Sequence, residues 1–216
     1  MPESTEGVPE AISGRQRNYR TMPPLVLPIT EVLVVADGWR TEPGAEEVIH
    51  RAIATAAEIA DADTGDAELA VMLTDDAGIR TLNGNWRGID KPTNVLSFPA
   101  LQPTGRGGPD DAPRMLGDIA IAYDTTRREA DDEQKPFDHH LSHLVVHGFL
   151  HLIGYDHEKD GDAEAMEALE REILAQLGIP NDDFHLPFEA LETAPADHLG
   201  VQATHLCRHL RNVAQQ

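Results

Sequence analysis

Residues 137–153 read FDHHLSHLVVHGFLHLI, and they form the most apolar helical segment of the chain. Leucine, valine and phenylalanine surround this segment instead of forming one stripe, which is typical of a helix that is buried on every side. Gly154 follows directly and predicts where the helix ends. We therefore expect residues 137–153 to form a central helix around which the rest of the domain packs.

Shorter segments of both kinds occur along the rest of the chain. The sequence predicts strands at residues 25–36, 68–74, 94–98 and 115–123, and helices at residues 45–60, 75–82, 125–132 and 163–177. Residues 83–93 contain Gly84, Gly88 and Pro92 and are expected to form a loop. Because strands and helices are interspersed, the pattern indicates a small sheet with helices packed on it.

The length of 216 residues suits one ordinary domain with additions at its ends. Residues 1–24 are polar, with scattered glycine and proline, and are expected to be a disordered leader. Residues 25–180 contain all the predicted strands and helices and form the expected domain. Residues 181–216 are expected to be an appended tail that is partly helical.

The net charge, the lengths of the apolar runs and the number of cysteines exclude several classes of protein. The formal net charge of −21 argues against a protein that holds nucleic acid through a general basic surface. Residues 80–128 differ, with seven basic and five acidic side chains, so a local basic groove remains compatible with the sequence. No apolar run reaches the ~18 residues that a membrane span needs. The polar start lacks the pattern of a secretory signal and the single cysteine excludes internal disulfide bonds, so we expect a cytoplasmic protein without membrane contacts.

Three histidines at the end of the central helix carry the clearest chemical signal. His147 and His151 are four residues apart, so their rings project from one face of a helix. Gly154 can adopt a positive φ and turn the chain, which would bring His157 back to the same point. Three neutral imidazoles leave one tetrahedral position open for water, the arrangement of a catalytic zinc site. Imidazole ligands also suit nickel and copper, so the spacing alone does not settle the metal.

Other side chains are candidates to orient these ligands. His143 continues the spacing of four residues and is a candidate to lie behind a metal-binding histidine, although the more expected reading is a partly exposed histidine on the helix. Asp118 and Asp156 are candidates to accept a hydrogen bond from the second ring nitrogen of a ligand.

The histidine segment matches the zinc-protease pattern H-E-x-x-H-x-x-G-x-x-H at every position except one. Gly148 stands where that pattern has the glutamate that moves a proton between water and the leaving amine. The sequence therefore has the three expected metal-binding histidines but lacks the glutamate that acts as the base in peptidases. A zinc metallopeptidase-like hydrolase would need a carboxylate from elsewhere, such as Asp118.

A second informative stretch covers residues 82–99, LNGNWRGIDKPTNVLSFP. Arg87 offers a planar pair of donors suited to two phosphate oxygens, and Lys91 adds a second positive charge. Asn94 and Ser97 add an amide and a hydroxyl on the strand that follows. We expect Arg87, Lys91, Asn94 and Ser97 to bind the substrate.

Together, residues 87–99, 116–119 and 147–157 resemble the YbeY family of bacterial endoribonucleases, in the family's order and within about residues 30–180. The resemblance implies an α+β fold, a small central mixed sheet of about four strands with helices packed around the buried metal-bearing helix. It implies one zinc on His147, His151 and His157, which count as catalytic together with Arg87. It also implies cleavage of single-stranded RNA, in 16S rRNA 3′ end maturation and ribosome quality control. The chemistry of the site leaves two nucleophiles open, zinc-activated water and the RNA 2′-hydroxyl.

The implied partners are an rRNA precursor and the small ribosomal subunit or its proteins. A non-catalytic ribosome-assembly factor with a structural zinc remains an alternative, because an acidic chain also suits binding to basic ribosomal proteins.

Overall fold

The computed structural model describes residues 27–62, 64–65, 67–100, 114–155 and 160–180. The expected leader at 1–24 and the expected tail at 181–216 lie outside these residues. The described strands are β1 (Ile29–Val34), β2 (Ala67–Thr74), β3 (Val95–Pro99) and β4 (Arg114–Ala122). The helices are the short η1 (Asp37–Thr41), α1 (Ala45–Ile59), α2 (Asp76–Arg87), α3 (Tyr123–Asp132), α4 (Phe137–Leu152) and α5 (Asp160–Gln176). Among the residues described, no helix is both long and apolar enough to cross a membrane.

The four strands form one mixed sheet in the order β1-β2-β4-β3. The strands β1, β2 and β4 run parallel, and β3 pairs antiparallel with β4. The register shifts by one residue between the pairs Glu68–Met115 and Leu69–Gly117, which marks a β-bulge. The expectation of an α+β fold with a mixed sheet of about four strands is confirmed.

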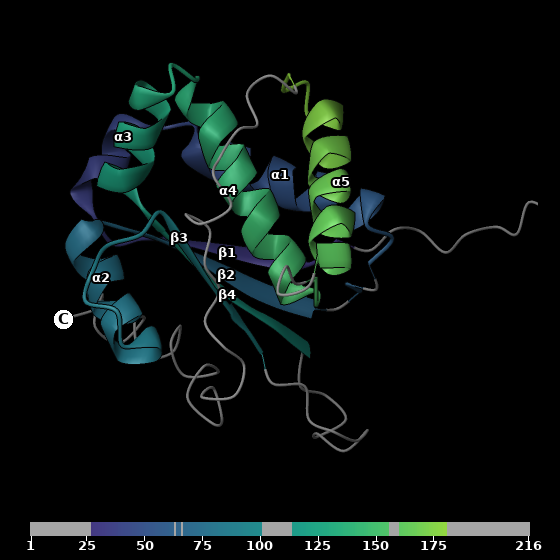
Figure 1. Cartoon of the computed structure of the whole chain (residues 1–216), viewed down its shortest axis with the longest axis horizontal. Helices are drawn as coiled ribbons and strands as arrows, with labels where there is room; N and C mark the ends of the chain where they lie inside the picture. Colours follow the sequence, from purple (N-terminus) through teal and green to yellow (C-terminus); the bar gives the residue numbers. More distant parts are fainter. Residues whose placement is uncertain (1–26, 63, 66, 101–113, 156–159, 181–216) are drawn as a thin grey trace, which may run out of the picture.

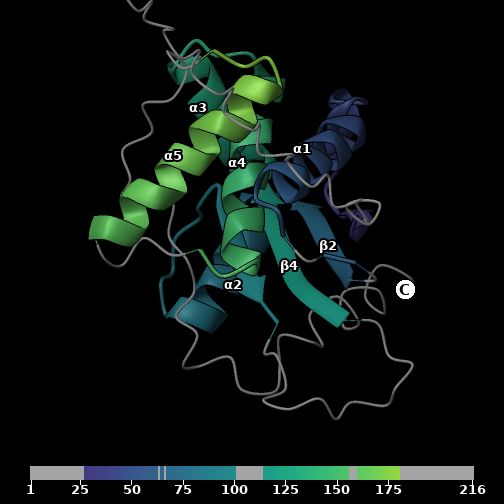
Figure 2. The ribbon, with the colours of Figure 1, turned by 90° about the vertical axis from the view of Figure 1, so that its right-hand side faces the viewer.

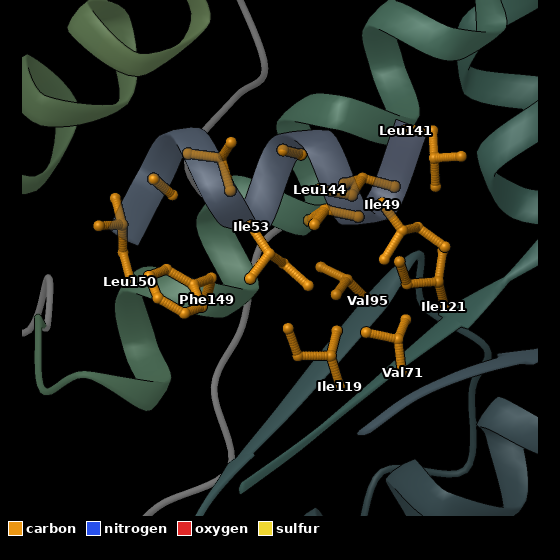
Figure 3. Close-up of a cluster of buried hydrophobic side chains, with 14 of the residues drawn as sticks. Ile49, Ile53, Val71, Val95, Ile119, Ile121, Leu141, Leu144, Phe149 and Leu150 are labelled. Atoms are coloured by element: carbon orange, nitrogen blue, oxygen red, sulfur yellow. The ribbon is translucent and has the colours of Figure 1, made fainter. Parts of the chain in front are cut away.

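Helices cover both faces of this sheet, because its inner strands are apolar on both sides. On β4, Ile119 and Ile121 face a large cluster shared with α1, α4 and α5, whereas Ala120 and Ala122 face a smaller cluster shared with α2. Figure 3 shows the large cluster, with side chains from α1, α4 and the sheet pointing toward one another. The two clusters place α2 on the face opposite α4.

The helix α4 lies at the centre of the larger layer. Figure 1 shows it between α3 and α5, and Figure 2 shows it flanked by α1 and α5. Every residue from 141 to 152 is buried. The predicted central helix is thus confirmed, with an end one residue earlier than expected.

The loop predicted at residues 83–93 is wrong for its first part, because α2 continues through Arg87. Asn83 is buried, and Gly84 is tolerated inside the helix. The helix ends at Gly88, which has φ +69° and whose amide donates to the carbonyl of Gly84. Tertiary burial outweighed the low helix propensity of asparagine and glycine here, and Arg87 consequently lies in the last turn of a helix.

Candidate metal centre and substrate-binding face

The two histidines of α4 approach each other closely. Their Nε2 atoms are 3.0 Å apart, and both residues are buried, with 3% and 4% of their surface exposed. The spacing of four residues in a regular helix produces this approach, as expected for His147 and His151. His157, the third predicted ligand, lies outside the described residues.

The turn after α4 fixes the ring of His151. Gly154 has φ +99°, the amide of Gly154 donates to the carbonyl of His151, and the amide of Tyr155 donates to that of Leu150. This pattern is a Schellman motif, and it directs the Tyr155 carbonyl oxygen to 2.9 Å from Nδ1 of His151. Because a carbonyl only accepts, Nδ1 of His151 carries the proton. The predicted turn at Gly154 is therefore confirmed.

The ring of His147 has a different partner. An oxygen of Glu170 on α5 lies 2.7 Å from its Nδ1, and the other oxygen lies 3.8 Å from Nε2 of His143. His143 is buried, with 6% of its surface exposed, so the favoured expectation of a partly exposed histidine is wrong, and its ring lies behind that of His147 on the far side of Glu170. Sequence reasoning named Asp118 and Asp156 for such a role and did not name Glu170. Asp156 lies outside the described residues, and a contact between either aspartate and a ligand stays a prediction. The available signal for Glu170 was a carboxylate within the apolar stripe of α5, between Met166 and Ile173.

Glu170 is 8% exposed, and its burial raises the pKa of the carboxyl group. The close contacts with His143 and His147, together with the charge that these rings carry when protonated, outweigh burial and hold the pKa of Glu170 well below its usual range. The carboxylate is therefore ionised at neutral pH. An ionised carboxylate only accepts, so Nδ1 of His147 is the donor.

These partners assign the protons of the site. With protons on both Nδ1 atoms, neutral rings of His147 and His151 direct two nitrogen lone pairs at each other across 3.0 Å. Such an approach is repulsive unless a cation or an additional proton lies between the nitrogens. Two nitrogens bound at ~2.0–2.1 Å to a tetrahedral zinc would be roughly 3.3 Å apart, close to the spacing observed. The pair therefore fits a metal ion.

Within the described ranges, no set of three His, Cys, Asp or Glu side chains forms a metal site.

Gly148 faces β3 and β4 across a short distance. A Cβ built on it would be 3.1 Å from Oγ of Ser97 and 3.1 Å from Cγ2 of Ile119. A larger side chain at this position would therefore meet β3 and β4. A glutamate at the helix position that carries the base in zinc proteases would therefore have to displace the side chains of Ser97 and Ile119 in this chain.

Arg87 and Lys91 lie around the end of α2, on a segment that several contacts hold. The amide nitrogen Nδ2 of Asn83 donates to the carbonyl of Lys91 at 2.8 Å. Arg80 donates to both oxygens of Asp90, with distances of 2.6 and 2.8 Å. The guanidinium of Arg80 holds the pKa of Asp90 below its usual value, first through these hydrogen bonds and then through its charge. Lys91 is exposed and Arg87 is half-buried.

Asn94 and Ser97 are buried, with 1% and 2% of their surface exposed. Nδ2 of Asn94 donates to Glu129 at 3.0 Å, and its Oδ1 accepts from the amide of Val95 at 2.7 Å. Glu129 also contacts Nε2 of His140 at 3.0 Å. Asn94 thereby joins β3 to α3 and α4, and its role as a substrate contact stays a prediction, like that of Ser97.

The structure brings His147 and His151 together on α4. Arg87 belongs to α2, which lies on the opposite face of the sheet. Trp86, its neighbour on α2, packs with Phe98 and Ala120 on the face opposite α4. The strand β3 is at the edge of the described sheet and separates α2 from α4 there. The helix that ends at Arg87 and the helix that carries the two histidines thus lie on either side of one edge strand.

A comparison with family models identifies the chain. The model described as Endoribonuclease YbeY matches residues 39–178. The chain belongs to the YbeY family. Membership supports a role as an endoribonuclease, which is a hydrolase.

Two named relatives agree with this membership. A protein named Endoribonuclease YbeY from Nitrobacter winogradskyi is 81% identical over 154 residues, which cover 71% of this chain and 81% of the relative. One of the same name from Nitrobacter hamburgensis is 73% identical over 181 residues, covering 84% and 95%. The solution structure of TM1509 from Thermotoga maritima has 25% identity and a TM-score of 0.47, covering 69% of this chain and 89% of that one.

Proposed function

We propose that the chain is a zinc-dependent endoribonuclease that cleaves single-stranded RNA, with the ion held by His147, His151 and His157. The facing Nε2 atoms of His147 and His151, with both Nδ1 atoms already used as donors, carry this proposal. The proposed setting is the cytoplasm, where the enzyme acts in 16S rRNA 3′ end maturation and ribosome quality control. The acidic charge of −21 supports basic proteins of the small ribosomal subunit as partners.

The chemistry divides between the metal and the chain. A zinc ion, when bound, supplies a Lewis acid and lowers the pKa of a coordinated water. The chain holds the rings of His147 and His151 in the tautomer that leaves Nε2 unprotonated, through Glu170 and the Tyr155 carbonyl. It offers no glutamate at position 148 for protonating a leaving amine, which favours a phosphodiester over a peptide as the substrate.

Arg87 and Lys91 are proposed to bind RNA phosphates. Arg87 neutralises charge on the non-bridging oxygens, an effect of about 3 kcal/mol by analogy with single oxyanion donors. Lys91 is exposed on the segment held by Asn83, so the RNA backbone can reach it. Because α2 and α4 lie on opposite faces, RNA that contacts both must pass the edge at β3. The buried Asn94 and Ser97 would then act mainly by shaping this edge.

The nucleophile is either water or the RNA 2′-hydroxyl. Products that end in a 2′,3′-cyclic phosphate would identify the 2′-hydroxyl, whereas linear ends without a cyclic intermediate would identify water.

Two substitutions test the proposal in one set of preparations. His151→Ala should lose stoichiometric zinc and cleavage of a structureless RNA together, because it removes one ligand. Arg87→Ala should keep zinc and lose about 100-fold in cleavage rate, the equivalent of about 2.7 kcal/mol. His50→Ala, an exposed histidine of α1, is the matched control and should change neither.

Zinc content and RNA cleavage retained by the His151 variant would remove this residue from the site. Folded, zinc-loaded protein that cleaves casein but not RNA would favour the peptidase alternative. Cleavage of neither would favour the non-catalytic assembly factor.

A further inference from the structure

We propose that Glu170 is a positioning residue that fixes the ring of His147 and strengthens its bond to the metal. This inference rests on the proposed metal site and adds a function for α5, which supplies the carboxylate. Glu170 contacts the metal ligand through the nitrogen that faces away from the ion, so it acts through His147.

The geometry assigns each oxygen of Glu170 to one histidine. Oε1 is 2.7 Å from Nδ1 of His147, and Oε2 is 3.8 Å from Nε2 of His143. The two histidines are four residues apart on α4, so one carboxylate from a neighbouring helix reaches both. This second contact limits rotation of the carboxylate about its own axis. The carboxylate therefore restricts the orientation of the His147 ring.

The burial of Glu170 indicates that its contact with His147 has a function. Glu170 is 8% exposed among Met166, Ile173 and Leu174, which are almost fully buried. An apolar residue would be the simpler choice at such a position, because burying an ionised carboxylate is costly unless it is paired. A carboxylate at this buried position therefore depends on the two histidines as its partners.

The two described ligands are oriented by acceptors of different kinds. His151 donates to a neutral backbone carbonyl, whereas His147 donates to a carboxylate. A charged acceptor draws the Nδ1 proton more strongly and makes the opposite nitrogen a better electron donor. We infer that His147 is the stronger of the two ligands, and that this strength depends on Glu170.

The experiment measures metal affinity rather than activity. Full-length protein is stripped of metal, and the zinc dissociation constant is determined by competition with a chromophoric chelator. Glu170→Leu, which removes the acceptor, should weaken zinc binding 10- to 100-fold. Glu170→Gln keeps an oxygen acceptor without the charge and should lose less. Glu172→Gln, an exposed acid of the same helix, is the matched control and should bind zinc like the wild type.

A Co²⁺-loaded sample supplies a second readout that a purely structural role would not change. The visible absorption bands should shift in the Glu170→Gln protein and stay unchanged in the Glu172→Gln protein. If the leucine variant does not fold, the glutamine variant still decides the question. Thermal unfolding of metal-free samples shows whether either substitution acts on the fold alone.

Wild-type affinity and an unchanged Co²⁺ spectrum in folded Glu170→Gln and Glu170→Leu proteins would overturn this inference and leave the proposed function intact. A wild-type chain that does not bind zinc with one-to-one stoichiometry would overturn both.

Discussion

At the scale of single residues, Gly154 connects the end of a helix to the chemistry of the site. Its φ of +99° lies in the left-handed region, which costs an L side chain about 1–2 kcal/mol. The same turn aims the carbonyl of Tyr155 at His151. The backbone conformation of one glycine thus sets the tautomer of His151, a proposed metal ligand, and fixes the orientation of its ring.

Gly154→Ala should therefore lower the free energy of unfolding by about 1 kcal/mol and weaken zinc binding in the same protein. Urea denaturation and chelator competition measure the two effects. Gly161→Ala is the control, because a Cβ there meets no atom within 4 Å and the residue has no positive φ. Equal stability of the two variants would show that the turn tolerates a side chain.

Local spacing explains why part of the site was predictable at this scale. His147 and His151 are four residues apart, and a helix alone brings their rings together. Glu170 follows His147 by 23 residues, and only the packing of α5 on α4 unites them. No periodicity within either helix predicts the contact between Glu170 and His147. An acidic residue on the apolar stripe of a helix does, however, indicate that it has a buried partner.

At the scale of elements, Gly148 allows α4 to lie directly on the sheet. Its missing side chain leaves Ser97 and Ile119 close to the helix backbone. A larger residue would have to displace these side chains or the helix itself. The close approach therefore couples the positions of His147 and His151 to β3 and β4.

Gly148→Glu, which would complete the zinc-protease pattern, should destabilise the protein by about 1–3 kcal/mol, because it overpacks the interface and buries a charge. Chemical denaturation measures the loss. Gly84→Glu on α2 is the control, since the nearest atom to its Cβ is 4.0 Å away. A stable Gly148→Glu protein that hydrolyses casein would show that the pattern, and not the packing, sets the chemistry.

Element boundaries were less predictable than element types. The strands and helices occur where apolar patterns indicated them, but α2 extends five residues beyond its predicted end. Its continuation depends on burial of Asn83 and on the hydrogen bond from this residue to Lys91, both of which are tertiary. Propensity in a window of sequence does not include such contacts.

At the scale of the whole molecule, the charge distribution limits how RNA can be held. The chain has 38 acidic and 17 basic residues, so most of its surface repels a polyanion. Attraction must come from a few cations presented locally, of which Arg87 and Lys91 are the proposed pair.

Binding of single-stranded RNA should therefore depend only weakly on salt. Two phosphate contacts predict a slope of roughly −1.4 in a plot of log affinity against log salt concentration, and Arg87→Ala should reduce it to roughly −0.7. Fluorescence anisotropy with metal-free protein, which prevents cleavage, measures both slopes. A slope several times steeper would require a larger basic surface than these two residues.

The order of the strands in the sheet has a consequence for biosynthesis. The inner pair joins residues 67–74 to 114–122, while the edge strand that completes the sheet comes between them in the chain. A chain that emerges from its N-terminus must expose residue 122 before the middle of the sheet can pair, and the two helices bearing His147, His151 and Glu170 emerge later still. A nascent polypeptide therefore passes through most of its translation before the residues of the proposed metal centre can come together.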